Sequence, residues 1–281
     1  MTEQSNDQGR TFVPIDAELP DKQQAKVFGG MAGWYENAPE DASLLPDDIE
    51  QLRQFLREGG PHLRKAVVAF LCDFGPVTWE DLETWALDPD KDVRNAAMFG
   101  MELSYKAATE LCASDKPRCA ALLAQVIEQH KDGYAGIVWS VLAGDDEWLA
   151  AIWPEVERLV DLNDDDIDLI LQCGFVEDML HHHHRMAPDD PRIVAWVKGK
   201  SRRRKQILLE IANWGRFEDP ALVHIVEALM NDPDQEISLY ATKMRDWYTG
   251  GREKAEAKQR RADDSPKKRE SKNVRRKHVD H

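Results

Sequence analysis

The feature that most constrains this chain is the segment DPDKDVRNAAMFGMEL at residues 88–103, which has a partial copy at residues 232–246. In both copies an Asp-Pro-Asp turn precedes apolar residues spaced three and four apart, a pattern typical of an amphipathic helix. Aligning the helix starts at Val93, Ile167 and Ile237 gives separations of 74 and 70 residues. Half of this interval is about 36 residues, one helical hairpin. A single amphipathic hairpin cannot bury its apolar face alone, so the repeat predicts a stack of helix pairs.

From Pro46 onward the chain keeps this spacing and shows no alternating strand pattern of useful length, which predicts an all-α fold. Proline, glycine and acidic residues mark the ends of the expected helices. The later helices are predicted at residues 117–130, 134–142, 147–162, 165–173, 191–197, 203–214, 220–230 and 235–247.

The ends of the chain differ from this helical region. Residues 1–26 are polar and lack periodicity, so we expect a flexible N-terminal lead. Residues 27–250 form the predicted repeat domain, which opens with a glycine-rich stretch containing Trp34 and Tyr35. That stretch is interpreted as an aromatic cap; a ligand loop is the alternative, but no strand precedes it. Residues 251–281 have almost no apolar residues and are expected to be a disordered basic tail.

The turn and helix at residues 88–97 carry the motif D-P-D-x-x-V-R-x-x-A, which resembles HEAT repeats, particularly the short bilin-lyase-like type. Its members are Asp88, Pro89, Asp90, Val93, Arg94 and Ala97. The resemblance covers roughly residues 46–248, and the second copy departs from it at Ser238, where Arg94 falls. It implies a right-handed solenoid of about six antiparallel helical hairpins with disordered termini. It also implies that the proline starts the turn, the aspartate caps the second helix and the arginine joins a ladder between adjacent repeats. These roles are structural.

Charge is unevenly distributed along the chain, whose net charge is −15. Residues 252–281 carry 12 Lys and Arg against 6 Asp and Glu, a net charge of +6. Residues 1–251 therefore carry 25 basic and 46 acidic residues, a net charge of −21. Such a field repels phosphate backbones and favours basic partners. The alternative is that the charge only keeps the protein in solution.

Two basic segments are candidate partner-binding sites. One is the cluster Arg202, Arg203, Arg204 and Lys205, which lies at an expected helix start, where cations oppose the helix dipole. It either binds an acidic peptide or nucleic acid, or pairs with acidic groups of its own chain. The other is the tail, which includes Lys267, Lys268 and Arg269. It either binds nucleic acid, anionic membranes or acidic proteins, or folds back on the acidic body.

Metal-binding and catalytic patterns are weak. The run His181 to His184 follows Glu177 and Asp178 and could bind a metal ion, but one segment does not supply a closed ligand set. The alternative is that these imidazoles lie at the C-terminal end of a helix, where the helix dipole favours them. The four cysteines show no CxxC pair, so buried reduced thiols are expected. GxSxG, Walker, HExxH and dinucleotide motifs are absent from the sequence. We therefore nominate no catalytic residue, metal or cofactor.

These observations predict a non-enzymatic scaffold, adaptor or immunity-type inhibitor whose acidic solenoid holds a basic protein partner. A nucleic-acid-associated protein that uses the tail is one alternative. Another is a HEAT-like enzyme, since the resembled family includes DNA glycosylases and bilin lyases; glycosylases of this kind use a basic groove, unlike this acidic body. No apolar run approaches the length of about 18 residues that spans a membrane, and the N-terminus lacks a secretory pattern, so a cytoplasmic protein is expected.

Overall fold

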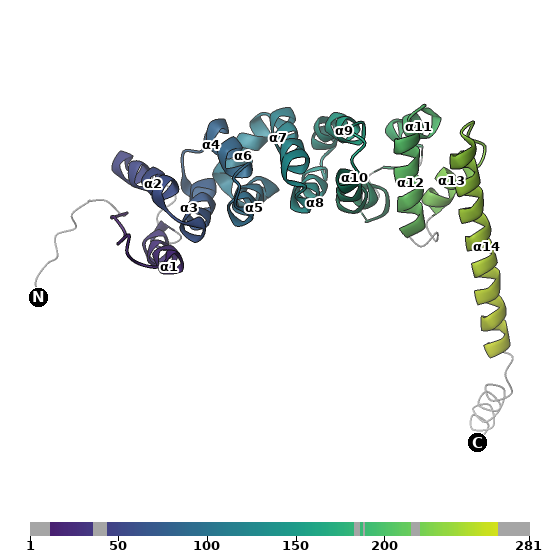
Figure 1. The fold of residues 1–281 in the computed structure, drawn as a ribbon, viewed down its shortest axis with the longest axis horizontal. Coiled ribbons are helices and arrows are strands. Elements are labelled where there is room, and N and C mark those ends of the chain that lie inside the picture. The colour runs from purple at the N-terminus through teal and green to yellow at the C-terminus, as the bar shows by residue number, and fades with distance from the viewer. Residues whose placement is uncertain (1–11, 36–43, 183–185, 188, 215–219, 264–281) are drawn as a thin grey trace, which may run out of the picture. The chain divides into compact units, whose positions relative to one another are not determined.

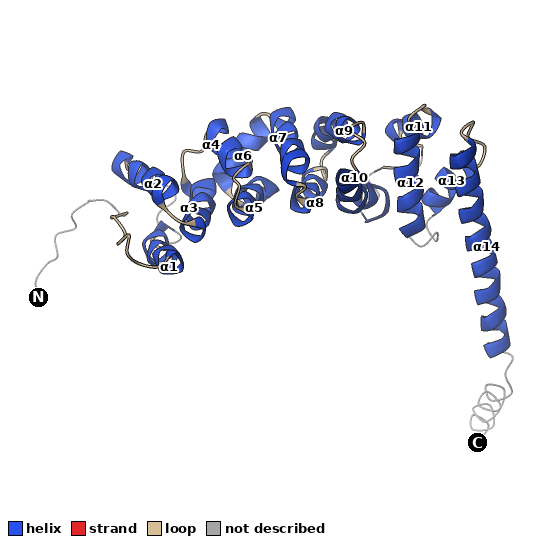
Figure 2. Cartoon of the chain, in the orientation of Figure 1, coloured by secondary structure: helices blue, strands red, loops and turns tan. Residues whose placement is uncertain are grey.

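The computed structural model describes residues 12–35, 44–182, 186–187, 189–214 and 220–263. Across these ranges the chain is all-helical, as predicted, and contains no strand (Figure 2). It divides into two compact units, Met1–Arg185 (unit 1) and Met186–His281 (unit 2). The sequence predicted one continuous repeat domain over residues 27–250. The boundary falls directly after the histidine run.

Unit 1 consists of helix pairs that contact the pairs before and after them (Figure 1). Its elements are α1 (Asp21–Ala32), α2 (Pro46–Glu58), α3 (Pro61–Phe74), α4 (Trp79–Ala86), α5 (Lys91–Phe99), the π-helical turn η2 (Gly100–Ser104), α6 (Lys106–Ser114), α7 (Lys116–His130), α8 (Gly133–Leu142), α9 (Asp146–Val160), α10 (Asp165–Leu171) and the π-helical turns η3 (Gln172–Val176) and η4 (Asp178–His182). Within pairs, α2 packs on α3, α4 on α5, α7 on α8 and α9 on α10. Between pairs, α3 packs on α5, α5 on α8, α4 on α7 and α7 on α9. In Figure 1, α4, α7 and α9 lie along one side of unit 1. Helices α3, α5, α8 and α10 lie along the other side, and we call them the second helices.

The described residues of unit 2 form four helices, of which α13 packs against both α12 and α14. They are α11 (Pro191–Lys198), α12 (Arg202–Trp214), α13 (Pro220–Leu229) and α14 (Gln235–Asp263). Helix α14 was predicted to end at residue 247, and it continues into the segment expected to be disordered. Residues 251–263 are rich in Ala, Glu, Lys and Arg, which all have high helix propensity. The helix therefore extends 16 residues beyond its predicted end at residue 247.

Most predicted helices of residues 116–230 agree with the structure to within two residues at each end. The agreement follows from acidic N-caps, because the carboxylates of Asp132, Asp145, Asp164 and Asp190 each accept a backbone N–H from the first turn that follows. Helix α10 is within this margin, and its last two predicted residues belong to the π-helical turn η3. None of the described helices is both long enough and apolar enough to span a bilayer.

Helix α1 lies in the range expected to be a flexible lead followed by an aromatic cap. Its first residue, Asp21, accepts hydrogen bonds from the backbone N–H groups of His62 (2.8 Å) and Leu63 (3.0 Å) and so caps α3. Burial raises the pKa of Asp21, but these bonds and the His62 ring outweigh burial and hold the pKa below its usual value. A capping contact 41 residues away along the chain stabilises α1 on α3.

An aromatic cluster covers the first helices of unit 1. The Phe12 ring stacks on Phe28 and Tyr35 at centroid distances of 5.5 and 5.9 Å and meets Phe70 edge-on at 5.1 Å. Phe12 is fully buried, and its N–H donates to the buried carboxylate of Asp48 (3.0 Å). The segment before α1 is therefore packed into the core from residue 12 onward. This packing agrees with the aromatic-cap interpretation of Tyr35.

Candidate binding surface

The Asp-Pro-Asp turn joins consecutive helix pairs through its first carboxylate. In Asp88, one oxygen accepts the N–H of Asp90 (2.8 Å) and the other accepts the guanidinium of Arg64 on α3 (2.5 Å). Asp90 caps α5 by accepting the N–H groups of Asp92 and Val93. One motif thus caps its own second helix and ties it to the preceding one.

The partial copy in unit 2 repeats these contacts. The carboxylate of Asp232 accepts the N–H of Asp234 (2.9 Å) and the ammonium of Lys205 on α12 (2.5 Å). The hydroxyl of Ser201 caps α12 by accepting the N–H of Arg204, and Lys205 lies four residues after Ser201. Arg64 likewise follows Gly60, the N-cap position of α3, by four residues. The cation of the pair could have been found from this spacing, which periodicity alone does not reveal.

Arg94 continues the connection toward the next pair in unit 1. Its buried guanidinium donates to the carbonyl oxygens of Asp88 (2.8 Å) and Pro89 (3.0 Å) and lies 3.4 Å from the carboxylate of Asp132. Asp132 caps α8 at its Tyr134 N–H (3.1 Å). Arg94 therefore links the start of α5 to the start of α8.

Lys131 links the following pair. Its ammonium donates to Asp164, the N-cap of α10, at 2.6 Å. This ammonium, together with N–H groups of the α10 first turn, holds the pKa of Asp164 below its usual value. The starts of α5, α8 and α10 are thus each capped by an aspartate. At α8 and α10 the cap itself also meets a cation of the preceding pair, whereas at α5 that contact is made by Asp88, two residues before the cap.

The basic cluster at the start of α12 is largely joined to groups of unit 2. Lys205 is 4% exposed and pairs with Asp232. Arg202 contacts the carboxylates of Asp234 (3.8 Å) and Glu236, and Arg204 lies 5.7 Å from the Trp196 ring centroid. Arg203 also has interactions within the protein. These contacts agree with intramolecular pairing, and partner binding by this cluster stays a prediction. Lys267, Lys268 and Arg269 lie outside the described residues.

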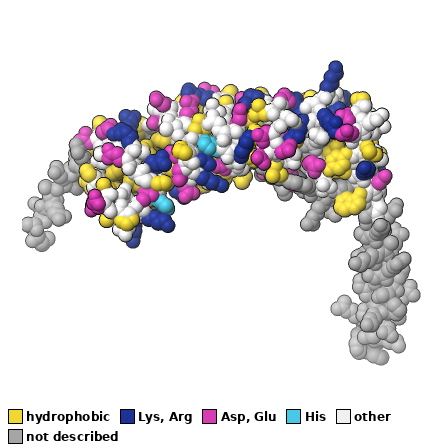
Figure 3. Space-filling model, in the orientation of Figure 1, with side chains coloured by type: hydrophobic (Ala, Val, Ile, Leu, Met, Phe, Trp, Pro, Cys, Tyr) yellow, Lys and Arg dark blue, Asp and Glu magenta, His cyan; other side chains and the backbone are white. Residues whose placement is uncertain are grey.

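The acidic excess belongs to unit 1 alone. Residues 1–185 carry 15 Lys and Arg against 36 Asp and Glu, a net charge of −21. Residues 186–281 carry 22 against 16, a net charge of +6, and within them residues 186–251 are balanced at 10 against 10. The sequence predicted an acidic body over residues 1–251, but the excess of acidic residues lies within residues 1–185. Acidic side chains are spread along the visible face of unit 1 (Figure 3).

Many of the cations in unit 1 are paired with carboxylates of the same unit, and each pair contributes little net field, so the charge of −21 comes from carboxylates outside these pairs. The pairs are Arg57–Glu50, Arg64–Asp88, Lys65–Asp92, Arg94–Asp132, Lys116–Glu147, Arg118–Glu83, Lys131–Asp164 and Arg158 with Glu128 and Glu155. A basic ligand is therefore attracted to the surface of unit 1.

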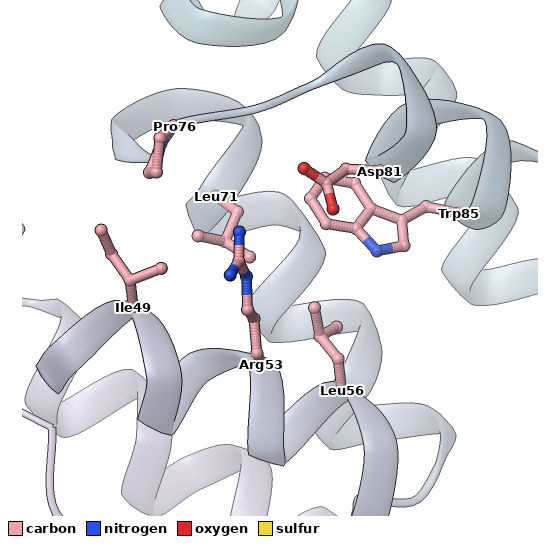
Figure 4. A pocket seen from close by; sticks show the side chains of 7 residues that line it. All are labelled: Ile49, Arg53, Leu56, Leu71, Pro76, Asp81 and Trp85. Carbon is pink, nitrogen blue, oxygen red and sulfur yellow. The ribbon is translucent and has the colours of Figure 1, made fainter. Parts of the chain in front are cut away.

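A hollow between α2, α3 and α4 lacks the size and the groups of an active site. Its lining residues are Ile49, Arg53, Leu56, Leu71, Pro76, Asp81 and Trp85 (Figure 4). Its cavity volume of about 10 Å³ has room for about one water molecule. Arg53 points into the hollow, while Asp81 is engaged in the capping box of α4 with Thr78. We assign it no catalytic role.

The thiols and histidines supply no metal centre among the residues whose side chains are described. No group of three His, Cys, Asp or Glu in this set could hold a metal ion. Cys72, Cys112 and Cys119 are buried and free, as expected. Burial raises the pKa of the Cys72 thiol, which keeps it neutral and unreactive. The side chains of the run from His181 to His184 lie outside the described set.

Searches of protein-family models, curated proteins and solved structures found no match to this chain.

Proposed function

We propose that this chain is a non-enzymatic protein-binding module built as a HEAT-like solenoid, in which acidic unit 1 holds a basic protein partner. The observation that carries the proposal is the confinement of a net charge of −21 to one compact unit of contacting helix pairs. An adaptor or an immunity-type inhibitor would use such a unit in the same way. The repeated Asp-Pro-Asp contacts and the pair-to-pair packing support the solenoid interpretation.

The chemistry of unit 1 favours binding over catalysis. Two of its buried carboxylates, Asp88 and Asp132, are engaged with cations and backbone N–H groups, so they act in structure. The exposed acidic residues form a field that accelerates encounter with a basic protein and disfavours acidic ones. The affinity of such a complex depends on ionic strength, because exposed charges are screened beyond about 10 Å at 0.1 M salt.

The test is affinity capture from the native lysate with the full chain as bait, followed by calorimetry with the purified partner. We expect a partner whose contacting region is basic, and an affinity that falls at least tenfold, by about 1.4 kcal/mol, between about 0.1 and 0.5 M salt. A bait with Asp165→Asn and Asp166→Asn in unit 1 should bind more weakly, while Asp246→Asn in unit 2 should not. An acidic partner, or an affinity that does not change with salt, would contradict the proposal.

A second candidate function follows from unit 2, whose net charge is +6 and whose helix α14 continues through the first basic residues of the tail. A basic helix of this kind can bind nucleic acid through phosphates. A gel-shift assay would compare the full chain with a chain ending at Asp263. We expect the shorter chain to bind duplex DNA less tightly, and equal binding would reject this candidate.

A further inference from the structure

Helix α8 presents a narrow apolar face to solvent. Its sequence, GYAGIVWSVL, contains no charged residue. All residues of α8 are buried except Gly133, Tyr134, Ile137 and Val141, which share one face of the helix. Ile137 is 48% exposed and Val141 is 39% exposed. Both apolar side chains therefore face solvent although their neighbours in the helix are core residues.

The flanking second helices continue this face at equivalent positions. Val141 lies nine residues after its N-cap Asp132, and Phe99 lies nine residues after Asp90. Ile137 and Leu169 each lie five residues after their N-caps. Phe99 is 43% exposed and Leu169 is 50% exposed.

The helices that carry these residues are neighbours, since α8 contacts both α5 and α10. All three begin at an aspartate cap and bury the residue three positions after it. Equivalent positions therefore point outward on adjacent helices. We call Phe99, Ile137, Val141 and Leu169 the apolar stripe.

Acidic residues flank the apolar stripe on the same helix faces. Asp92 precedes Phe99 by seven residues on α5, and Glu102 lies beyond Phe99 in the π-helical turn η2. Asp166 precedes Leu169 by three residues and is exposed. Residues three, four and seven apart share one side of a helix. The Tyr134 hydroxyl donates to Glu102 (2.7 Å), which fixes that carboxylate beside α8. Two cations with described contacts lie near these helices: Lys65, 4.0 Å from Asp92, and Lys131, 2.6 Å from Asp164.

We propose that the apolar stripe docks an amphipathic helix of the partner, with apolar residues on one face and Lys or Arg on its flanks. This inference rests on the proposed function and assigns it a surface and a kind of ligand. Packed helices lie about 8–10 Å apart, so a stripe over three helices is roughly 20 Å long and matches about 13 residues of helix. A helix places basic residues beside its apolar face, where they reach the acidic flanks. In an extended segment alternate side chains point to opposite faces, so basic residues between apolar anchors would point away from the surface of unit 1.

The test uses the full chain and a defined probe, a fluorescein-labelled amphipathic helix of Leu and Lys of about 18 residues. A scrambled peptide of the same composition has the same charge without the apolar face. We expect the amphipathic peptide to bind at least tenfold more tightly than the scramble. Ile137→Ser and, independently, Leu169→Ser should each weaken its binding about tenfold, because apolar anchors dominate such interfaces. Val27→Ser on α1 is the matched control, since Val27 is 44% exposed and lies away from the stripe.

Equal binding of the two peptides would overturn the inference, because it would show attraction by charge alone. Equal weakening by Val27→Ser and Ile137→Ser would overturn it as well. Circular dichroism of each variant excludes unfolding as the cause, since all three positions are well exposed. The proposed function has a separate test in the salt dependence of the captured partner, so failure of the stripe leaves that result unchanged.

Discussion

Replacement of Arg94 by methionine removes the buried cation that links α5 to α8. Arg94 is 7% exposed and Asp132 is 4% exposed, so the substitution leaves a carboxylate buried without its cation. Breaking a buried pair by removing one partner costs about 3–5 kcal/mol. The nitrogen–oxygen distance of 3.4 Å is long, so we expect a loss near the lower value, about 3 kcal/mol.

Urea unfolding followed by circular dichroism measures this loss. Because the chain has two compact units, hydrogen exchange of the peptide covering α5 assigns the change to unit 1. The matched control is Arg57→Met, whose exposed pair with Glu50 is worth less than about 1 kcal/mol. Adding Asp132→Asn to Arg94→Met should recover about 2 kcal/mol, because it removes the orphaned charge and keeps an oxygen that accepts the Tyr134 N–H.

Two results would refute this reasoning. If Arg94→Met costs no more than Arg57→Met, the buried pair does not stabilise the joint between helix pairs. If the double variant loses the sum of the two single losses, the two side chains act independently.

Three further predictions concern the other joints. Lys205→Met should lower the free energy of unfolding by about 3 kcal/mol, since it orphans buried Asp232; a loss below 1 kcal/mol in urea unfolding would contradict this. Gly60→Ala should lower the free energy of unfolding by about 1–2 kcal/mol, because the added Cβ would lie 2.5 Å from the Asp21 carboxyl carbon. Gly29→Ala places its Cβ in open space and should raise the free energy of unfolding by about 0.5–1 kcal/mol. If Gly60→Ala has the higher melting temperature of the two variants, Asp21 does not cap α3 as described. The contribution of Asp21 should be present above about pH 4 and lost as the pH falls through its lowered pKa, so the difference in unfolding free energy between the wild type and Asp21→Asn should shrink below pH 4. A difference that stays constant to pH 2 would show that this carboxylate is not the cause.

Helix class and most boundaries could be predicted because they depend on local chemistry. Aspartates such as Asp132 and Asp164 precede apolar stripes, and a carboxylate at that position caps a helix regardless of distant contacts. Helix α1 could not be predicted in the same way. Its sequence contains Gly29 and Gly30, which disfavour helix, and it is stabilised by the packing of Phe28 and by the cap that Asp21 provides to α3.

The surface residues were harder to predict than the fold. Alignment of the two Asp-Pro-Asp segments identified Asp232 but not its partner Lys205, because that ion pair joins α12 to the turn before α14, and the two residues are 27 apart in sequence. Ile137 and Val141 belong to the most apolar predicted helix, and periodicity places such residues in the core. Only the packing of α5 and α10 beside α8 shows which face remains exposed.

Hydrogen exchange of the full chain with and without its captured basic partner tests the central claim most directly. We predict slower exchange in peptides from α5, α8 and α10, with peptides from α12 and α13 unchanged. Slower exchange confined to unit 2 would contradict the assignment of binding to the acidic unit.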